Sequence, residues 1–197
     1  MKVLLLGAGK KTDEPLDKIL FRLPDKDNGL PAITELVRLD YNLDREPDVV
    51  WDLNVKPWPF EDNSFDEVHA YNVMEHLGRQ GDAKAFFDEH YEIWRILKPF
   101  GRYMGCCPTM KNPWVLAEPS HTRVLLPHTF NFLNGDVEAV EHGIENTSTS
   151  DFRHLWKGDL RFAWVKENYT PIDWGWIMQA IKGDHFGKPS NYINGLT

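Results

Sequence analysis

The chain has 197 residues, and its 42% hydrophobic and 26% charged residues are typical of a folded globular protein and exclude a disordered or fibrous chain. This length fits a single domain over residues 1–197. The formal net charge is −8 and no lysine- or arginine-rich run occurs, so binding to long nucleic acid is disfavoured, although a locally basic cleft would escape this argument.

Apolar runs and cysteines indicate the compartment. The longest apolar stretches, such as residues 3–6, are far shorter than the ~20 residues that span a bilayer, and no secretion signal is recognisable. The two cysteines, Cys106 and Cys107, are adjacent, and such neighbours rarely reach disulfide geometry. We therefore expect a cytoplasmic protein without a membrane partner, and the sequence leaves homo-oligomer formation open.

Short, mostly apolar runs predict strands that are buried on both faces, as in a parallel sheet. In chain order, they are residues 2–6, 36–39, 49–52, 66–70 and 102–107. Between the last two strands, residues 81–97 carry apolar side chains at helical spacing, with Asp82 as the N-terminal cap. A strand, a helix and a strand in this order predict a right-handed crossover.

The second half of the chain is less regular. We predict a short helix near residues 127–133, a hairpin between residues 152–156 and 160–167, and a last helix over residues 173–182. The predicted fold class is α/β: a mixed, mostly parallel sheet with an antiparallel edge hairpin and helices on both faces.

Small and acidic residues follow the first three predicted strands. Gly7-Ala8-Gly9 follows the first strand, Asp40 ends the second and Asp52 ends the third. Because the carboxyl ends of parallel strands share one edge, this layout can hold an adenosine in the crevice of an open sheet. Two other nucleotide patterns fit less well, because Thr12 and Leu4 stand where a dinucleotide fingerprint and a phosphate loop need small residues. A turn without a ligand and solvated acids are the alternatives.

From the third strand onward the sequence resembles a known family. The segments are residues 52–53 (DL), 58–68 (WPFEDNSFDEV), 72–77 (NVMEHL) and 96–101 (ILKPFG). In this order they are similar to class I S-adenosylmethionine-dependent methyltransferases of the type 11 kind. Residues 118–123 (EPSHTR) and 128–130 (HTF) are similar to a later segment in a subset of that family.

The resemblance implies a Rossmann-like sheet of seven strands whose last strand is antiparallel, with S-adenosylmethionine as the cofactor. Residues 1–107 would form the cofactor-binding half, and residues 108–197 the acceptor-side half with the C-terminal tail. The implied cofactor contacts are Gly7, Ala8 and Gly9 under the methionine part, Asp40 on the ribose, Tyr41 beside the adenine, Asp52 and the Leu53 amide on the adenine ring, and Tyr71 and Asn72 beside the sulfonium. The sequence departs from the family after Gly9, where an irregular segment up to Leu30 predicts a short or broken first helix.

His76 and His121 are the candidate catalytic bases, because imidazole titrates near neutral pH, and Glu75 is a candidate for orienting either ring. Packing and hydrogen bonding are the alternative role for His76. Glu75 could instead contact the cofactor's amino group or be no more than a charge at a helix end. We predict no metal, because the sequence holds neither a pair of cysteines separated by two other residues nor a pair of histidines separated by three.

These residues predict methyl transfer, by in-line displacement, to an oxygen or nitrogen of a small or medium-sized acceptor. Arg123, close to His121, favours an anionic or hydroxyl-rich acceptor, such as a phosphorylated or glycan-like molecule. One alternative is a non-catalytic cofactor-binding or scaffold module with the same fold. A second alternative, a nicotinamide-dependent oxidoreductase, lacks the glycine that Thr12 replaces.

Overall fold

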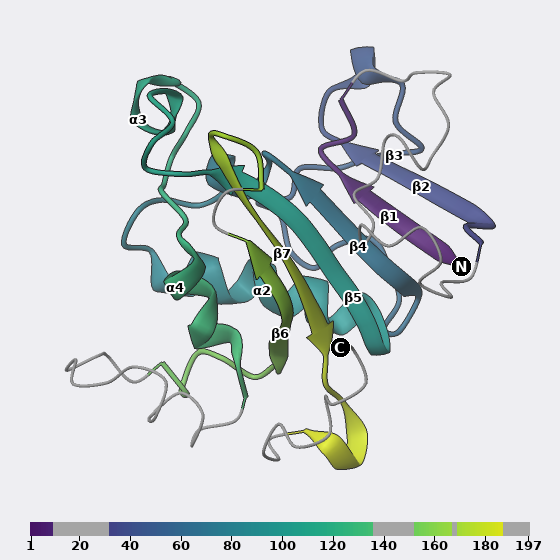
Figure 1. Ribbon diagram of the computed structural model, residues 1–197. Helices are drawn as coiled ribbons and strands as arrows, with labels where there is room; N and C mark the ends of the chain where they lie inside the picture. Colours follow the sequence, from purple (N-terminus) through teal and green to yellow (C-terminus); the bar gives the residue numbers. More distant parts are fainter. Residues whose placement is uncertain (10–31, 136–151, 167–168, 187–197) are drawn as a thin grey trace.

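One mixed sheet forms the centre of the computed structural model, which describes residues 1–9, 32–135, 152–166 and 169–186 (Figure 1). Seven strands of these residues lie in the order β3-β2-β1-β4-β5-β7-β6. Their bounds are Lys2–Leu6 (β1), Glu35–Asp40 (β2), Val49–Val50 (β3), Phe65–Tyr71 (β4), Leu97–Pro108 (β5), Leu160–Lys166 (β6) and Asp173–Ala180 (β7). The strands from β3 to β5 are parallel, and β7 is antiparallel to both β5 and β6. The predicted α/β class and mixed sheet are confirmed.

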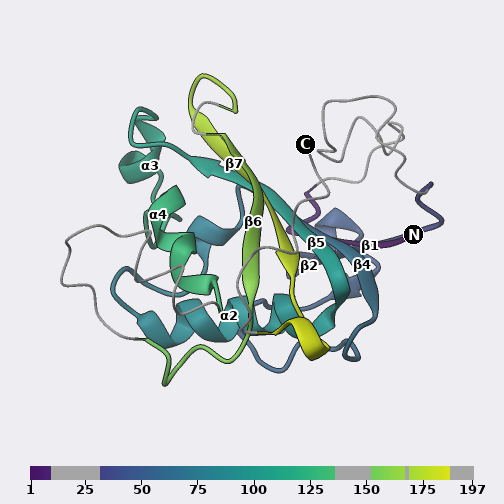
Figure 2. The same cartoon turned by 60° about the horizontal axis from the view of Figure 1, so that its bottom comes forward.

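The helices of the described residues are few and mostly short. They are α2 (Ala83–Ile96), α3 (Trp114–Ala117), α4 (Pro127–Phe130) and the 3-10 turns η1 (Leu43–Arg45), η2 (Met74–His76), η3 (Asn131–Leu133) and η4 (Gly183–His185). Helices α2 and α4 lie on the same face of the sheet (Figure 2). The segment in which we expected a short first helix lies outside the described residues.

The predicted crossover helix is confirmed as α2. The Asp82 carboxylate accepts a hydrogen bond from the Ala85 amide at 3.0 Å, which caps the first turn. Phe87, Ile93 and Ile96 are buried against the sheet. The helix leads directly into β5 at Leu97, and the pairing of β5 with β4 is irregular close to this start.

The predicted helix over residues 173–182 is wrong, because Asp173–Ala180 is strand β7. Trp174, Trp176 and Met178 alternate along the strand into the main core, and Ile177 on the opposite face is also buried. A strand inserted between β5 and β6 is covered on both faces, so its apolar run carried no clear alternation. Both tryptophans are therefore part of the core.

The predicted hairpin exists with a different partner strand. Residues 152–156 form turns, in which the Trp156 amide donates to the Phe152 carbonyl, and β6 pairs with β7 instead. The rings of Phe152 and Trp156 lie 5.3 and 5.9 Å from the ring of Phe87 on α2. These two apolar side chains therefore pack against α2 and do not form a strand.

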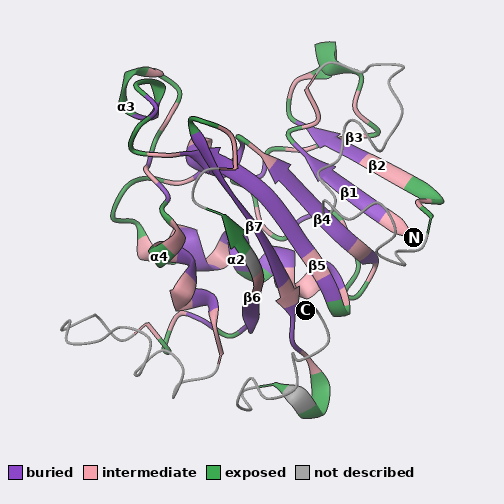
Figure 3. Cartoon of the chain, in the orientation of Figure 1, coloured by how far each residue is buried: buried purple, intermediate pink, exposed green. Residues whose placement is uncertain are grey.

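An aromatic cluster fills the space between the sheet and its helices. The Phe130 ring of α4 lies 4.9 Å from Trp176, 5.1 Å from Trp174 and 5.2 Å from His90 of α2. All four side chains are buried, as are the central strands (Figure 3). Residues from both halves of the chain thus share one core. The carboxyl ends of the parallel strands lie outside this aromatic cluster and can form a site.

Candidate active site

A cavity of 630 Å³ opens at the carboxyl ends of β1, β2, β3 and β4. Eight residues that the sequence singled out line it: Gly7, Gly9, Asp40, Tyr41, Asp52, Leu53, Asn72 and His76. The cavity lies within the volume range of small-molecule and cofactor sites, about 300–1,000 Å³. The predicted convergence of the first three strand ends around one space is therefore observed.

The turn after β1 requires glycine at both of its ends. Gly7 and Gly9 have φ angles of 58° and 57°, in the left-handed region that side chains disfavour. A Cβ on Gly7 would lie 2.4 Å from Cγ2 of Val73, whereas a Cβ on Gly9 would meet nothing within 4 Å. Gly9 therefore borders open space, and Gly7 is packed against the end of β4.

Asp40 ties this turn to the end of β2. Its Oδ2 accepts a hydrogen bond from the Gly9 amide at 3.3 Å, and its Oδ1 accepts one from the Asn42 amide at 2.9 Å. A carboxylate offers about four acceptor positions, so each oxygen can still accept one hydroxyl of a ligand. Asp40 is thus fixed in place and remains able to bind a ribose.

The segment after β3 forms the opposite wall of the cavity. Asp52 is exposed, and its Oδ1 accepts hydrogen bonds from the Asn54 amide and side chain at 2.8 and 3.0 Å. Trp51 also lines the cavity, and the sequence analysis missed it. Its place directly before the strand-end Asp52 was the available signal, but the residue was counted as part of a strand.

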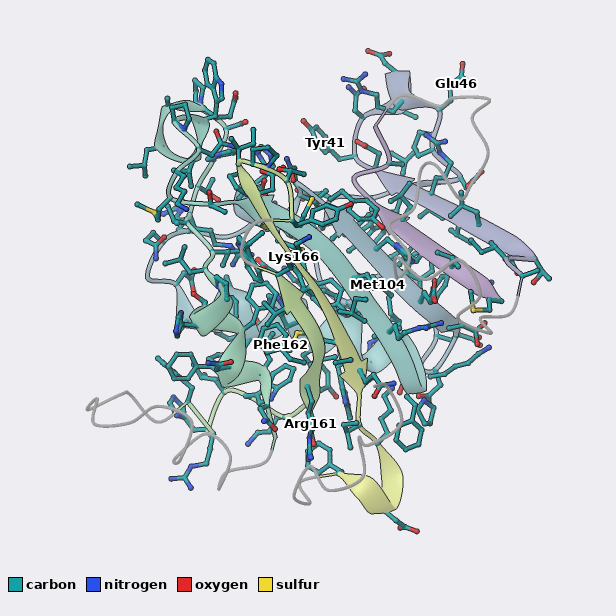
Figure 4. The ribbon with its side chains drawn as sticks, in the orientation of Figure 1. Tyr41, Glu46, Met104, Arg161, Phe162 and Lys166 are labelled. Atoms are coloured by element: carbon teal, nitrogen blue, oxygen red, sulfur yellow. The ribbon has the colours of Figure 1, made fainter. Side chains whose placement is uncertain are left out.

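Two aromatic residues assigned to the cofactor differ in position. Tyr41 is 77% exposed, lines the cavity and projects beyond the strand ends (Figure 4). Tyr71 packs against the cluster of Val3 and Leu5, and its hydroxyl lies 2.7 Å from Nδ1 of His69. Neither Tyr71 nor Ala8, which belongs to the same cluster, lines the cavity.

Asn72 shapes the turn at the end of β4. Its φ angle is 52°, a left-handed conformation that asparagine adopts more readily than most residues. Its amide donates to the Cys106 carbonyl at 2.9 Å, and the Cys106 thiol donates to its Oδ1 at 3.1 Å. Burial raises the pKa of Cys106 to about 12, so this thiol acts as a donor and is not a nucleophile.

The three predicted catalytic residues lie together beside the cavity. The ring centroids of His76 and His121 are 4.8 Å apart, and Nε2 of His121 lies 4.0 Å from Oε1 of Glu75. Nδ1 of His76 is 3.1 Å from the Ser120 carbonyl, and Nδ1 of His121 is 3.3 Å from the Val115 carbonyl. Because a carbonyl only accepts, each Nδ1 donates a hydrogen bond and each Nε2 is left for other partners.

Glu75 is the most enclosed member of this cluster, with 1% of its surface exposed. Its Oε2 accepts from the Cys107 thiol at 3.3 Å, and its Oε1 has no hydrogen-bond partner in the described part of the chain. Burial raises the pKa of this carboxyl, while the Cys107 thiol and the two imidazoles act in the opposite direction.

Arg123 links the segments that carry Glu75, His76 and His121. Its Nε donates to the Met74 carbonyl at 3.0 Å, its Nη2 pairs with Glu89, and the Thr122 and Arg123 amides donate to the Glu75 carbonyl. These bonds fix the loop that carries His121 against η2. Arg123 is only 5% exposed, so the predicted direct contact with an acceptor is wrong and the residue has a positioning role.

Comparison with known proteins gives the class. Residues 34–105 match the methyltransferase domain family. No curated protein matches the chain. The chain resembles a solved S-adenosylmethionine-dependent methyltransferase from Archaeoglobus fulgidus, with 17% identity, a TM-score of 0.52 and coverage of 90% of this chain and 85% of that one.

A second solved structure is the N-methyltransferase NodS from Bradyrhizobium japonicum, with 9% identity, a TM-score of 0.52 and coverage of 92% of this chain and 86% of that one. Its complex with S-adenosyl-L-homocysteine matches with 10% identity, a TM-score of 0.50 and coverage of 92% and 78%. At these identities, the likeness shows the fold.

The family match and the fold define the class of protein. Residues 34–105 match the methyltransferase domain family and the fold is that of solved methyltransferases, so the predicted resemblance to the type 11 kind is confirmed. With it, the expected enzyme class and S-adenosylmethionine as the cofactor are confirmed. None of the helices that the structure describes is long and apolar enough to cross a membrane.

The residues around the cavity fit this cofactor. Gly9 leaves open space beside the first turn, and Asp40 and Asp52 offer carboxylate oxygens from two strand ends. Leu53 and Val73 add apolar surface between them. These features suit the cofactor's ribose, adenine and amino-acid parts, and Asn72 and His76 line the same cavity.

Proposed function

We propose that the chain transfers a methyl group from S-adenosylmethionine to an oxygen or nitrogen of a small or medium-sized acceptor. The observation that carries the proposal is the single 630 Å³ cavity, in which Gly9, Asp40 and Asp52 meet at one edge of the sheet. The glycine turn would hold the methionine part, Asp40 the ribose hydroxyls, and Asp52, Leu53 and Tyr41 the adenine. The S-adenosyl-L-homocysteine complex of NodS supports the same use of this fold.

The bound cofactor supplies an electrophilic methyl group on a cationic sulfonium. The chain's part is then to align an acceptor atom with that methyl group and to exclude water, and such alignment lowers barriers by about 7–11 kcal/mol. The carbon–sulfur bond breaks as the carbon–oxygen or carbon–nitrogen bond forms.

His76 and His121 are the residues that we propose act on the acceptor, together with Glu75. With Nδ1 of each ring bonded to a carbonyl, a neutral ring can take the proton of the acceptor's hydroxyl or amine group on Nε2, and of the two rings that of His76 lines the cavity. Glu75, close to His121, stabilises positive charge that develops on the cluster. The arrangement therefore suits an acceptor that arrives protonated.

A second cavity, of 240 Å³, supports an acceptor of modest size. It lies beyond the carboxyl end of β5, between the loop at Thr109–Lys111 and the start of α4, and Met110, Leu126 and Trp174 give it apolar walls. Lys111 and His128 at the same cavity can bind an anionic or hydroxyl-rich group, the role that was first assigned to Arg123.

The cofactor part of the proposal is tested by calorimetric titration with S-adenosyl-L-homocysteine. Asp40→Asn keeps the shape of the side chain and removes its charge, and a charge-assisted hydrogen bond contributes about 1.5–3 kcal/mol. We expect the dissociation constant to rise about 10-fold to 100-fold. Asp44→Asn is the control, because Asp44 is exposed in η1 and does not line the cavity.

Absence of binding by the unmodified chain, or an unchanged constant in Asp40→Asn, would contradict the proposed site. Binding without methyl transfer to any member of a panel of alcohols, amines and sugar phosphates, tested with and without divalent ions, would instead support the non-catalytic alternative.

A further inference from the structure

The cluster of Glu75, His76 and His121 has the geometry of a metal site. One carboxylate oxygen and one nitrogen from each ring lie within 4.8 Å of one another. Ligands of a tetrahedral ion lie about 3.3 Å apart when the ion sits about 2.0–2.1 Å from each nitrogen and oxygen. The observed 4.0 Å between His121 and Glu75 is close enough for small side-chain rotations to complete such a site.

The hydrogen bonds around the rings favour this use of the cluster. Both Nδ1 atoms contact backbone carbonyls, of Ser120 and Val115, and a histidine that binds a metal commonly donates its second nitrogen in this way. The arrangement fixes the ring orientation and leaves Nε2 of each ring as the ligand atom.

Glu75 provides an independent observation that points to a ligand. Its Oε1 is buried, has no hydrogen-bond partner among the residues described, and lies on the side of His121. A buried carboxylate oxygen without a partner is unfavourable, so such atoms usually have an unseen partner. A cation between Glu75 and the two rings would satisfy it.

We propose that Glu75, His76 and His121 bind a divalent transition-metal ion at the edge of the methyl-transfer cavity. Two imidazoles and one carboxylate suit zinc, iron(II) or manganese(II), and leave positions open for further ligands. His76 lines the cavity, so these open positions would face the acceptor. The proposal rests on the proposed function and specifies it: with the ion bound, the two rings hold the metal instead of taking the acceptor's proton, and the ion holds the acceptor's nucleophilic atom.

The ion would bind ligands from two segments that are far apart in the sequence. A metal ion lowers the pKa of a bound hydroxyl, so the acceptor's proton can leave to water and the lone pair becomes available to the methyl group. The sequence analysis predicted no metal because the ligands do not form a short repeated motif: Glu75 and His76 are neighbours in η2, and His121 comes from the loop after α3.

The test uses untagged full-length chain that has been treated with a chelator and then titrated with zinc, manganese(II) and cobalt(II). We expect one ion per chain by calorimetry and, for cobalt, visible absorption bands of a site with nitrogen and oxygen ligands. In His121→Ala and Glu75→Gln, the affinity should fall by at least about 10-fold to 100-fold. His154→Ala is the matched control, because His154 is exposed and lies in the turns before β6.

A parallel titration with S-adenosyl-L-homocysteine separates this proposal from the proposed function. If the unmodified chain binds the cofactor product but none of the three ions stoichiometrically, the metal site is refuted and the methyltransferase proposal stands. Equal metal affinity in His121→Ala and the unmodified chain would also refute it. The titration of the unmodified chain is decisive even if a variant fails to fold.

Discussion

Gly7 and Gly9 share a backbone conformation but differ in what surrounds them. Both have positive φ angles, so an alanine at either position costs about 1–2 kcal/mol in backbone strain. Only at Gly7 does the added Cβ also collide with Val73, and such overpacking adds about 1–3 kcal/mol. An alanine substitution therefore causes backbone strain at both positions and a steric clash at Gly7 alone.

We predict that Gly7→Ala lowers the free energy of unfolding by about 2–5 kcal/mol and Gly9→Ala by about 1–2 kcal/mol, as measured by urea denaturation. Gly9→Ala should raise the dissociation constant of S-adenosyl-L-homocysteine, because its Cβ extends into the cavity. Equal stability losses in the two variants would contradict the packing of Gly7 on β4.

At the same scale, the sequence predicted the strand-end residues well and the catalytic surroundings poorly. Asp40 and Asp52 followed from their positions at the ends of apolar runs. Tyr71 was misassigned because successive strand side chains point to opposite faces: it shares the face of His69, to which it is bonded, and not that of Ala70. The pairing of His76 with His121 depends on tertiary contacts that no local pattern encodes.

Among the elements, η2 depends on the loop that follows α3. Arg123 joins them through the Met74 carbonyl and Glu89, and both its own side chain and that of Glu89 are buried. We predict that Arg123→Lys keeps the charge opposite Glu89 but loses the bond to Met74, since lysine has no equivalent of the guanidinium fork. His76 and His121 would then be misaligned.

Arg123→Lys should reduce the methyl-transfer rate constant by about 10-fold to 100-fold, with little change in S-adenosyl-L-homocysteine affinity. Arg161→Lys is the matched control, because Arg161 forms a similarly buried pair with Asp159. Arg161 lies near the start of β6, away from Tyr41 and the cavity (Figure 4). A similar loss of rate in both variants would show that general destabilisation, and not positioning, is responsible.

Elements with a single dominant pattern were the ones that the sequence predicted. Helix α2 combines a cap at Asp82 with apolar side chains at helical spacing, so its signal was unambiguous. Strand β7 and the residues before β6 were misjudged for one shared reason: their tryptophans and phenylalanines enter the core from short segments, and an aromatic-rich run is compatible with a helix, a strand or a covering loop.

At the scale of the whole molecule, the two halves of the chain share one sheet and one hydrophobic core. Strand β7 of the second half pairs with β5 of the first half over residues 173–179, and Phe130 of the second half packs on His90 of the first. A single unfolding transition is therefore expected, and the protonation state of His90 at this junction affects the stability of the whole chain.

His90 is fully buried, and burial lowers its pKa to about 3 in the folded chain. In the unfolded chain the imidazole takes up a proton near pH 6.5, so between these values the unfolded state binds more protons and stability falls as the pH falls. Glu75 and Glu89, whose pKa values are raised from 4.5 by burial, act in the opposite direction as the pH falls from their raised values toward 4.5, so the contribution of His90 needs a variant to isolate it.

We predict that the free energy of unfolding of the unmodified chain contains a His90 contribution that falls by about 2 kcal/mol between pH 7 and pH 5, as follows from the two pKa values. His90→Gln cannot take up this proton and keeps a donor for the Phe86 carbonyl, so its stability should fall by about 2 kcal/mol less over the same interval.

Urea denaturation at both pH values, followed by tryptophan fluorescence and by circular dichroism, measures the difference and checks that the two signals report one transition. Parallel stability curves for the two proteins would show that His90 does not stay neutral in the folded core, and separate transitions would show that β7 does not unite the two halves.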